Sequence, residues 1–113
     1  MGTVLAFPGP SNQRQVTFER LELNRIVELY GRMVSAGLWK DYAIQFRPDA
    51  ASFHAFRRAA EQPQYRIEKR PDQRGAGALW ALIGEAGQVL RRGPELGPVL
   101  APLERRLMKL VAS

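Results

Sequence analysis

Hydrophobic residues fall at three- and four-residue steps from Thr17 onward, which is the spacing of one face of an α-helix. They are Phe18, Leu23, Ile26, Val27, Tyr30, Met33 and Val34. Thr17 stands where a hydroxyl would cap the first turn, and Gly37 stands where a left-handed glycine would end the last one. We therefore expect a helix over residues 18–36, with Glu28 and Arg32 on its solvated face.

The hydrophobic period falls to two after Trp39, as is typical of half-buried strands. Short turns rich in glycine and proline divide the pattern, so the sequence predicts an antiparallel meander of five strands. The expected strands cover residues 42–47, 52–58, 64–70, 78–83 and 88–92. Residues 71–77 contain a proline and two glycines, and we expect an irregular loop there.

Two of these strands carry more specific signals. Phe53 and Phe56 are three residues apart, so the second strand must contain a bulge or bury both of its sides. On the third strand, Tyr65 and Ile67 alternate with charged residues and should point inward. The outward residues of that strand are Arg66, Glu68 and Arg70.

Helical spacing returns at the end of the chain, where one apolar stripe is formed by Leu96, Val99, Leu100, Leu103, Leu107 and Leu110. Pro98 is tolerable in a first turn, whereas Pro102 predicts a bend near Ala101 or a restarted helix. The pattern as a whole indicates an α+β fold: an N-terminal helix, a five-stranded antiparallel sheet and a C-terminal helix. Both helices most simply cover one sheet face and leave the other partly open.

The length of 113 residues predicts a single domain, which we place at residues 17–113. Residues 1–16 have the composition of a flexible tail, although their apolar run at residues 4–7 is also suited to adding a strand or entering a partner groove. No stretch is long and apolar enough to span a membrane, and the early Pro-Gly-Pro is unlike a signal peptide. These features predict a cytoplasmic protein.

Residues that carry chemistry are scarce. The chain has no cysteine and one histidine, which argues against disulfides, thiol catalysis, most metal sites and a bound cofactor. His54 and Ser52 share one face of a strand, but no acid or oxyanion loop accompanies them in the sequence. We expect a protein without catalytic residues, and an enzyme that uses His54 is the least favoured alternative.

Positive charge is the strongest functional signal. The formal net charge is +6, and the basic residues gather on the second and third strands and in the loop that follows. We expect the binding residues to be Arg57, Arg58, Arg66, Lys69, Arg70 and Arg74. Outward-facing Trp80 or His54 would add a stacking surface, which makes nucleic acid the favoured partner.

Three alternatives to nucleic-acid binding stay open. An acidic protein is a second type of partner for the same basic residues. Homodimerisation or protein binding through the C-terminal leucine stripe or the apolar tail is another. The third is a solvated sheet face on which arginine and glutamate pair across strands, with arginine in excess because the genome is rich in G and C.

Three short runs also resemble a known family: residues 30–34 (YGRMV), 39–44 (WKDYAI) and 65–71 (YRIEKRP). They are similar to a small alphaproteobacterial family, domain of unknown function 2794, over about residues 18–92. The resemblance implies a bacterial, cytoplasmic protein from a GC-rich genome. It implies no activity and no site.

Overall fold

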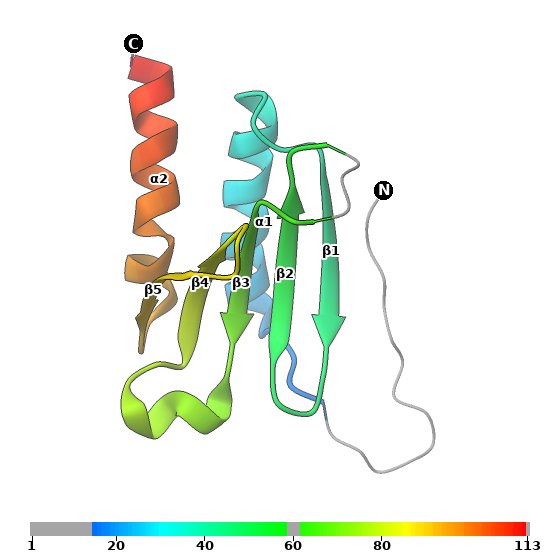
Figure 1. Ribbon diagram of the computed structural model, residues 1–113, viewed down its shortest axis with the longest axis vertical. Coiled ribbons are helices and arrows are strands. Elements are labelled where there is room, and N and C mark those ends of the chain that lie inside the picture. Colours follow the sequence, from blue (N-terminus) through cyan, green and yellow to red (C-terminus); the bar gives the residue numbers. More distant parts are fainter. Residues whose placement is uncertain (1–14, 59–61, 113) are drawn as a thin grey trace.

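The computed structural model describes residues 15–58 and 62–112, which form two helices and one five-stranded sheet (Figure 1). The α+β fold expected from the sequence is confirmed. In chain order the elements are α1 (Arg20–Ser35), β1 (Asp41–Phe46), β2 (Ala51–Phe56), β3 (Tyr65–Lys69), the 3₁₀ helix η1 (Pro71–Ala76), β4 (Trp80–Gly84), β5 (Val89–Gly93) and α2 (Leu96–Ala112). The expected tail at residues 1–16 lies almost entirely outside the described residues.

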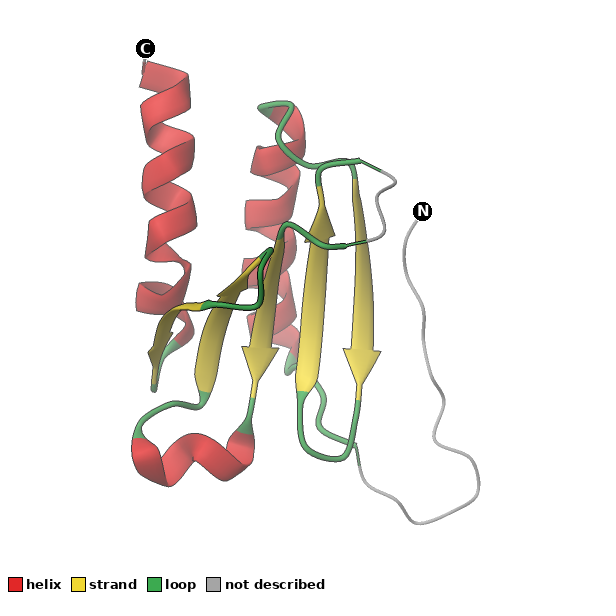
Figure 2. Ribbon diagram, viewed as in Figure 1, coloured by secondary structure: helices red, strands yellow, loops and turns green. Residues whose placement is uncertain are grey.

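The sheet is an antiparallel meander in the order β1-β2-β3-β4-β5, so each strand pairs with its neighbours in the sequence (Figure 2). The register places Ile44, Phe53, Ile67 and Leu82 side by side in one row across four strands. Strand β2 pairs with both neighbours in continuous register, without a bulge. It is a strand with two buried sides, because Ser52 and Phe53 point in opposite directions and both are buried.

Both helices pack on the face that carries this hydrophobic row. Ile26, Leu29 and Met33 of α1 join Leu100 and Leu103 of α2 in a single buried cluster with the sheet. Most of the C-terminal leucine stripe is therefore core. Trp80 also lies in this cluster, stacked on Phe18 with ring centroids 6.0 Å apart. The stacking surface that an outward Trp80 would have provided is therefore absent.

Two local expectations are wrong, and one of the two alternatives at Pro102 is excluded. The N-cap of α1 is Glu19, not Thr17, because Glu19 and Glu22 form a reciprocal capping box. Residues 71–76 form a 3₁₀ helix that starts at a proline and ends at Gly77, whose φ of 70° suits glycine. Helix α2 runs through Pro102 without restarting. The missing Pro102 amide would bond the Pro98 carbonyl, so only one backbone hydrogen bond is lost.

A buried ion pair ties α1 to the central strand. Lys69 points toward the helices, where its Nζ lies 2.7 Å from Glu22 Oε1 and 3.1 Å from the carbonyl oxygen of Thr17. The same Glu22 oxygen accepts the backbone amide of Glu19 at 2.7 Å. One carboxylate thus caps the helix and neutralises the lysine beneath it.

We predict that Lys69→Met lowers the free energy of unfolding by about 2–4 kcal/mol, because Glu22 is left without its buried counter-ion. The double variant Lys69→Met/Glu22→Met should lose less than the sum of the two single variants, since it removes both charges together. Chemical denaturation followed by circular dichroism measures all three. Strict additivity would contradict the coupling of these residues.

Candidate anion-binding face

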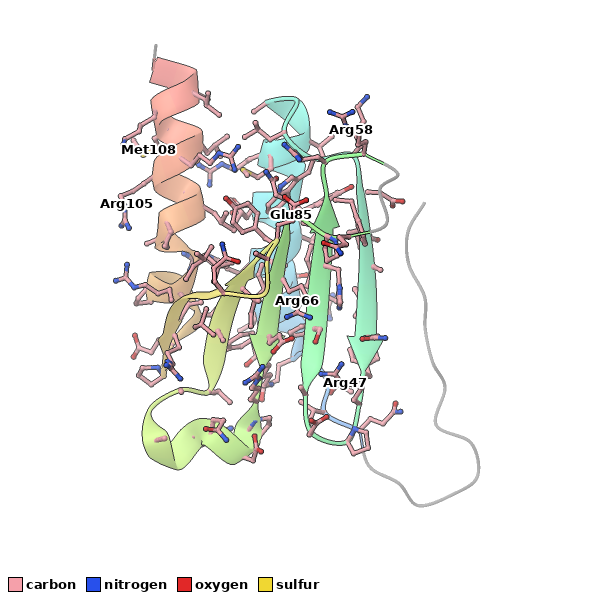
Figure 3. All side chains as sticks on the ribbon, viewed as in Figure 1. Arg47, Arg58, Arg66, Glu85, Arg105 and Met108 are labelled. Carbon is pink, nitrogen blue, oxygen red and sulfur yellow. The ribbon has the colours of Figure 1, made fainter. Side chains whose placement is uncertain are left out.

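The sheet surface opposite the helices, which we call the open face, carries polar residues on neighbouring strands. The strand register aligns His54 with Arg66, and Ser52 with Glu68. Arg92 of β5 lies opposite Ala81 and has the same orientation. Figure 3 shows Arg47 and Arg66 on this face, with α1 behind the strands.

A buried carboxylate organises the centre of the open face. Glu68 is only 3% exposed, and its Oε1 accepts hydrogen bonds from Nε (2.9 Å) and Nη2 of Arg70. Its Oε2 lies 3.9 Å from Nε of Arg66. The side chain of Arg66 remains 34% exposed, and that of Arg70 remains 41% exposed. A buried carboxylate therefore hydrogen-bonds one solvent-facing cation, Arg70, and lies within ion-pair distance of a second, Arg66.

The structure divides the basic residues expected from the sequence. Arg66 and Arg70 lie together on the open face, as expected. Lys69 is on the other face and is buried in its pair with Glu22, so it is not part of this surface. Arg57 and Arg58 follow β2, at the end of the sheet opposite Arg70, and Arg74 is exposed on η1. Arg57 lies 3.9 Å from Glu85, a weak exposed ion pair.

Two further arginines join Arg66 and Arg70. Arg47 was not among the expected site residues, whereas the fifth strand, with Arg91 or Arg92, was an expected extension of the basic surface. Arg47 follows β1 and hydrogen-bonds Gln45 on the open face at 3.4 Å, with Asp49 also 3.5 Å away. Arg92 approaches the same end of the sheet from β5. In the sequence, Arg47 alternates with the inward residues Tyr42, Ile44 and Phe46, so its side chain is expected on the outward face. This alternation was the signal that could have identified Arg47.

His54 lies among these charges on the open face. Burial lowers the pKa of His54, the cations of Arg66 and Arg47 lower it further, and the Glu68 carboxylate partly opposes them. Its Nε2 and the Ser52 hydroxyl are buried without a hydrogen-bond partner among the described residues. The backbone direction places both side chains on one face, but no hydrogen bond joins them.

Two hollows flank His54 and Arg66. One of about 220 Å³ is lined by Ala43, Gln45 and His54. Another, of about 450 Å³, lies between Arg66, Pro63 and the turn at residues 84–87. The surface at the centre of the face is thus indented, with an arginine at the larger hollow.

The described residues contain no group of three His, Asp or Glu side chains placed to hold a metal ion. Within the same residues, neither helix has the length and apolarity needed to cross a membrane.

Comparison with known protein families finds a match. The family model described as "Protein of unknown function (DUF2794)" matches residues 16–100. The chain belongs to this family. The match to DUF2794 spans α1, the whole sheet and the start of α2, so it includes every residue of the open face. No curated protein and no solved structure matches this DUF2794 chain.

We predict that His54 makes the DUF2794 domain less stable as the pH falls below about 6.5. The folded-state pKa is lowered, so between the two pKa values the unfolded chain binds more protons, and acidification favours unfolding. His54→Gln should remove this contribution. The thermal midpoints of both proteins between pH 5 and 8 test the effect, and parallel pH profiles would contradict it.

Proposed function

We propose that the open face is a noncatalytic binding surface for the phosphate backbone of nucleic acid. The observation that carries the proposal is the arrangement of Arg66 and Arg70 on Glu68: the carboxylate is buried and both guanidinium groups reach the solvent. Each guanidinium has five N–H donors, and Glu68 uses only some of them. The outer donors match the oxygens of a phosphate.

Holding the arginines in place favours binding. A free arginine side chain loses rotamer entropy when it engages a ligand, and the contact with Glu68 has already restricted that freedom for Arg70. Glu68 itself is shielded from an approaching anion by the side chains above it. The face therefore presents its cations and hides its central negative charge.

The extent of the surface suits a polymer better than a small anion. Arg47 follows the first strand and Arg92 lies on the fifth, so four strand spacings of about 4.8 Å place their backbones about 19 Å apart. A DNA duplex carries on the order of ten phosphate charges over that length. The net charge of +6 also favours association with a polyanion.

The face is suited to backbone contacts without reading of bases. Trp80 is in the core, and Tyr65 packs on the helix side of β3, where Arg106 donates a hydrogen bond to its hydroxyl at 2.9 Å. The rings with open-face parity among the described residues are His54 and Phe56, and both are half-buried. Affinity should therefore depend strongly on salt and weakly on sequence.

The experiment is fluorescence anisotropy of labelled single-stranded RNA and duplex DNA at several salt concentrations. We expect Arg47→Gln/Arg92→Gln to weaken binding and to reduce the slope of log affinity against log salt by roughly 0.7–0.9 per arginine that contacts a phosphate. These two arginines are chosen because neither is bound to Glu68, so the buried carboxylate keeps both of its partners.

The matched control is Arg20→Gln/Arg105→Gln, which removes the same charge from exposed helix positions; Figure 3 shows Arg105 directed away from the sheet. This control should keep most of the affinity and the full slope. If both double variants lost the same affinity, the binding would depend on net charge alone and not on the open face. Absence of binding at low salt would reject nucleic acid and leave an acidic protein as the partner for this face.

A further inference from the structure

A groove of about 790 Å³ lies between α1 and α2, away from the open face. Its walls come from the C-terminal halves of the two helices: Gly31, Ser35 and Ala36 on α1, and Leu107, Met108 and Val111 on α2. The α1 wall combines these small residues with the charged pair Glu28 and Arg32, and the α2 wall is apolar. The surface is therefore both concave and hydrophobic, unlike the solvated helix face that the sequence predicts there.

Large apolar side chains border this groove in contact with water. Met108 is 66% exposed and Val111 is 72% exposed. Figure 1 shows the C-terminal turns of α2 projecting past the strands, so the sheet does not cover them. Exposed apolar residues beside an apolar groove are typical of an interaction site.

The groove and its projecting residues are complementary to each other. A Cβ added at Gly31 would meet no atom within 4 Å, so this position leaves room for a side chain from outside. Met108 and Val111 are the apolar side chains available to enter such a space. The open space at Gly31 and the projecting side chains of Met108 and Val111 belong to one surface patch. An isologous contact between identical chains requires such a self-complementary patch.

The charges on the α1 wall are also self-complementary. Glu28 and Arg32 both line the groove and stand one helical turn apart. When two such helices run antiparallel about a two-fold axis, Glu28 of each can face Arg32 of the other, so each dimer gains two ion pairs. A parallel arrangement in register would instead place like charges together.

We infer that this groove is the contact surface of a homodimer, in which α1 lies antiparallel to α1 of a second copy and Met108 packs toward Gly31 of that copy. The inference does not depend on nucleic-acid binding. The groove is on the helix side of the sheet, so both open faces of the dimer stay accessible.

The first test is the mass of the full chain by light scattering and sedimentation velocity over a range of concentrations. We expect a concentration-dependent dimer for the wild type. Gly31→Gln should fill the groove and shift the protein to monomer, while helix propensity keeps α1 folded. Met108→Lys should have the same effect, whereas the control Leu21→Lys, at an apolar position that is 81% exposed and outside the groove, should leave the dimer intact.

Charge reversal provides the decisive test. Glu28→Arg and Arg32→Glu should each weaken the dimer at least tenfold, because each places like charges across the two-fold axis. Mixing the two variants should restore dimers, since the opposite charges then face each other between unlike chains. If Glu28 and Arg32 only paired with each other within one helix, mixing the two variants would not restore dimers.

A monomeric wild type at all concentrations would overturn the inference. It would also be overturned by a dimer that survives Gly31→Gln and Met108→Lys, or by charge-reversed variants that stay monomeric when mixed while the wild type dimerises. Thermal unfolding of each variant separates a lost interface from a lost fold. Anisotropy binding measured on the monomeric variants keeps this result separate from the function of the open face.

Discussion

Side-chain alternation along β3 is the constraint on which the architecture depends. This strand is central in the sheet, and successive residues point to opposite faces. Ile67 and Lys69 therefore go to the helices, while Arg66 and Glu68 go to the open face. A shift of β3 by one residue in register would turn Arg66 and Arg70 toward the helices and Ile67 toward the open face. The apolar core thus fixes which charges reach the solvent.

The two charged centres beside this strand solve the same problem in different ways. A buried charge requires a partner and enough hydrogen bonds to replace water. Under the helices, Lys69 obtains them from Glu22 and a backbone carbonyl, and it is almost completely enclosed. On the open face the buried member is Glu68, and its arginine partners extend outward. The Lys69–Glu22 pair is buried and stabilises the fold, whereas Arg66 and Arg70 still have N–H donors exposed to solvent.

The fold was largely predictable because its signals are local. The change of period after Trp39, the alternation along β3 and the apolar stripes of the two helices specify the elements without knowledge of distant contacts. Two errors are local, namely the N-cap of α1 and the 3₁₀ helix at residues 71–76. The assignment of Lys69 to the basic surface was wrong for another reason, because there a tertiary partner decides. Lys69 has inward parity, but only the approach of Glu22 makes burial of its ammonium favourable. The orientation of Trp80 stayed open in the sequence for the same reason, because its stacking on Phe18 joins residues far apart in the chain. Arg66 and Arg70 could be predicted as a pair from parity alone, and the outward parity of Arg47 was visible in the same way although this residue was not among the expected site residues.

The positions of the open face and the helix groove follow from one asymmetry of the fold. Two helices on one side of the sheet bury the hydrophobic row, and the other side must then be covered by charged and polar residues. Helix α2 continues beyond the strands that support it, and among the described residues nothing buries the apolar side chains of Met108 and Val111 in its last turns. The first feature yields a charged surface made of strands and the second yields an apolar surface made of helices. Since the two surfaces lie on opposite sides of the sheet, occupation of one leaves the other accessible.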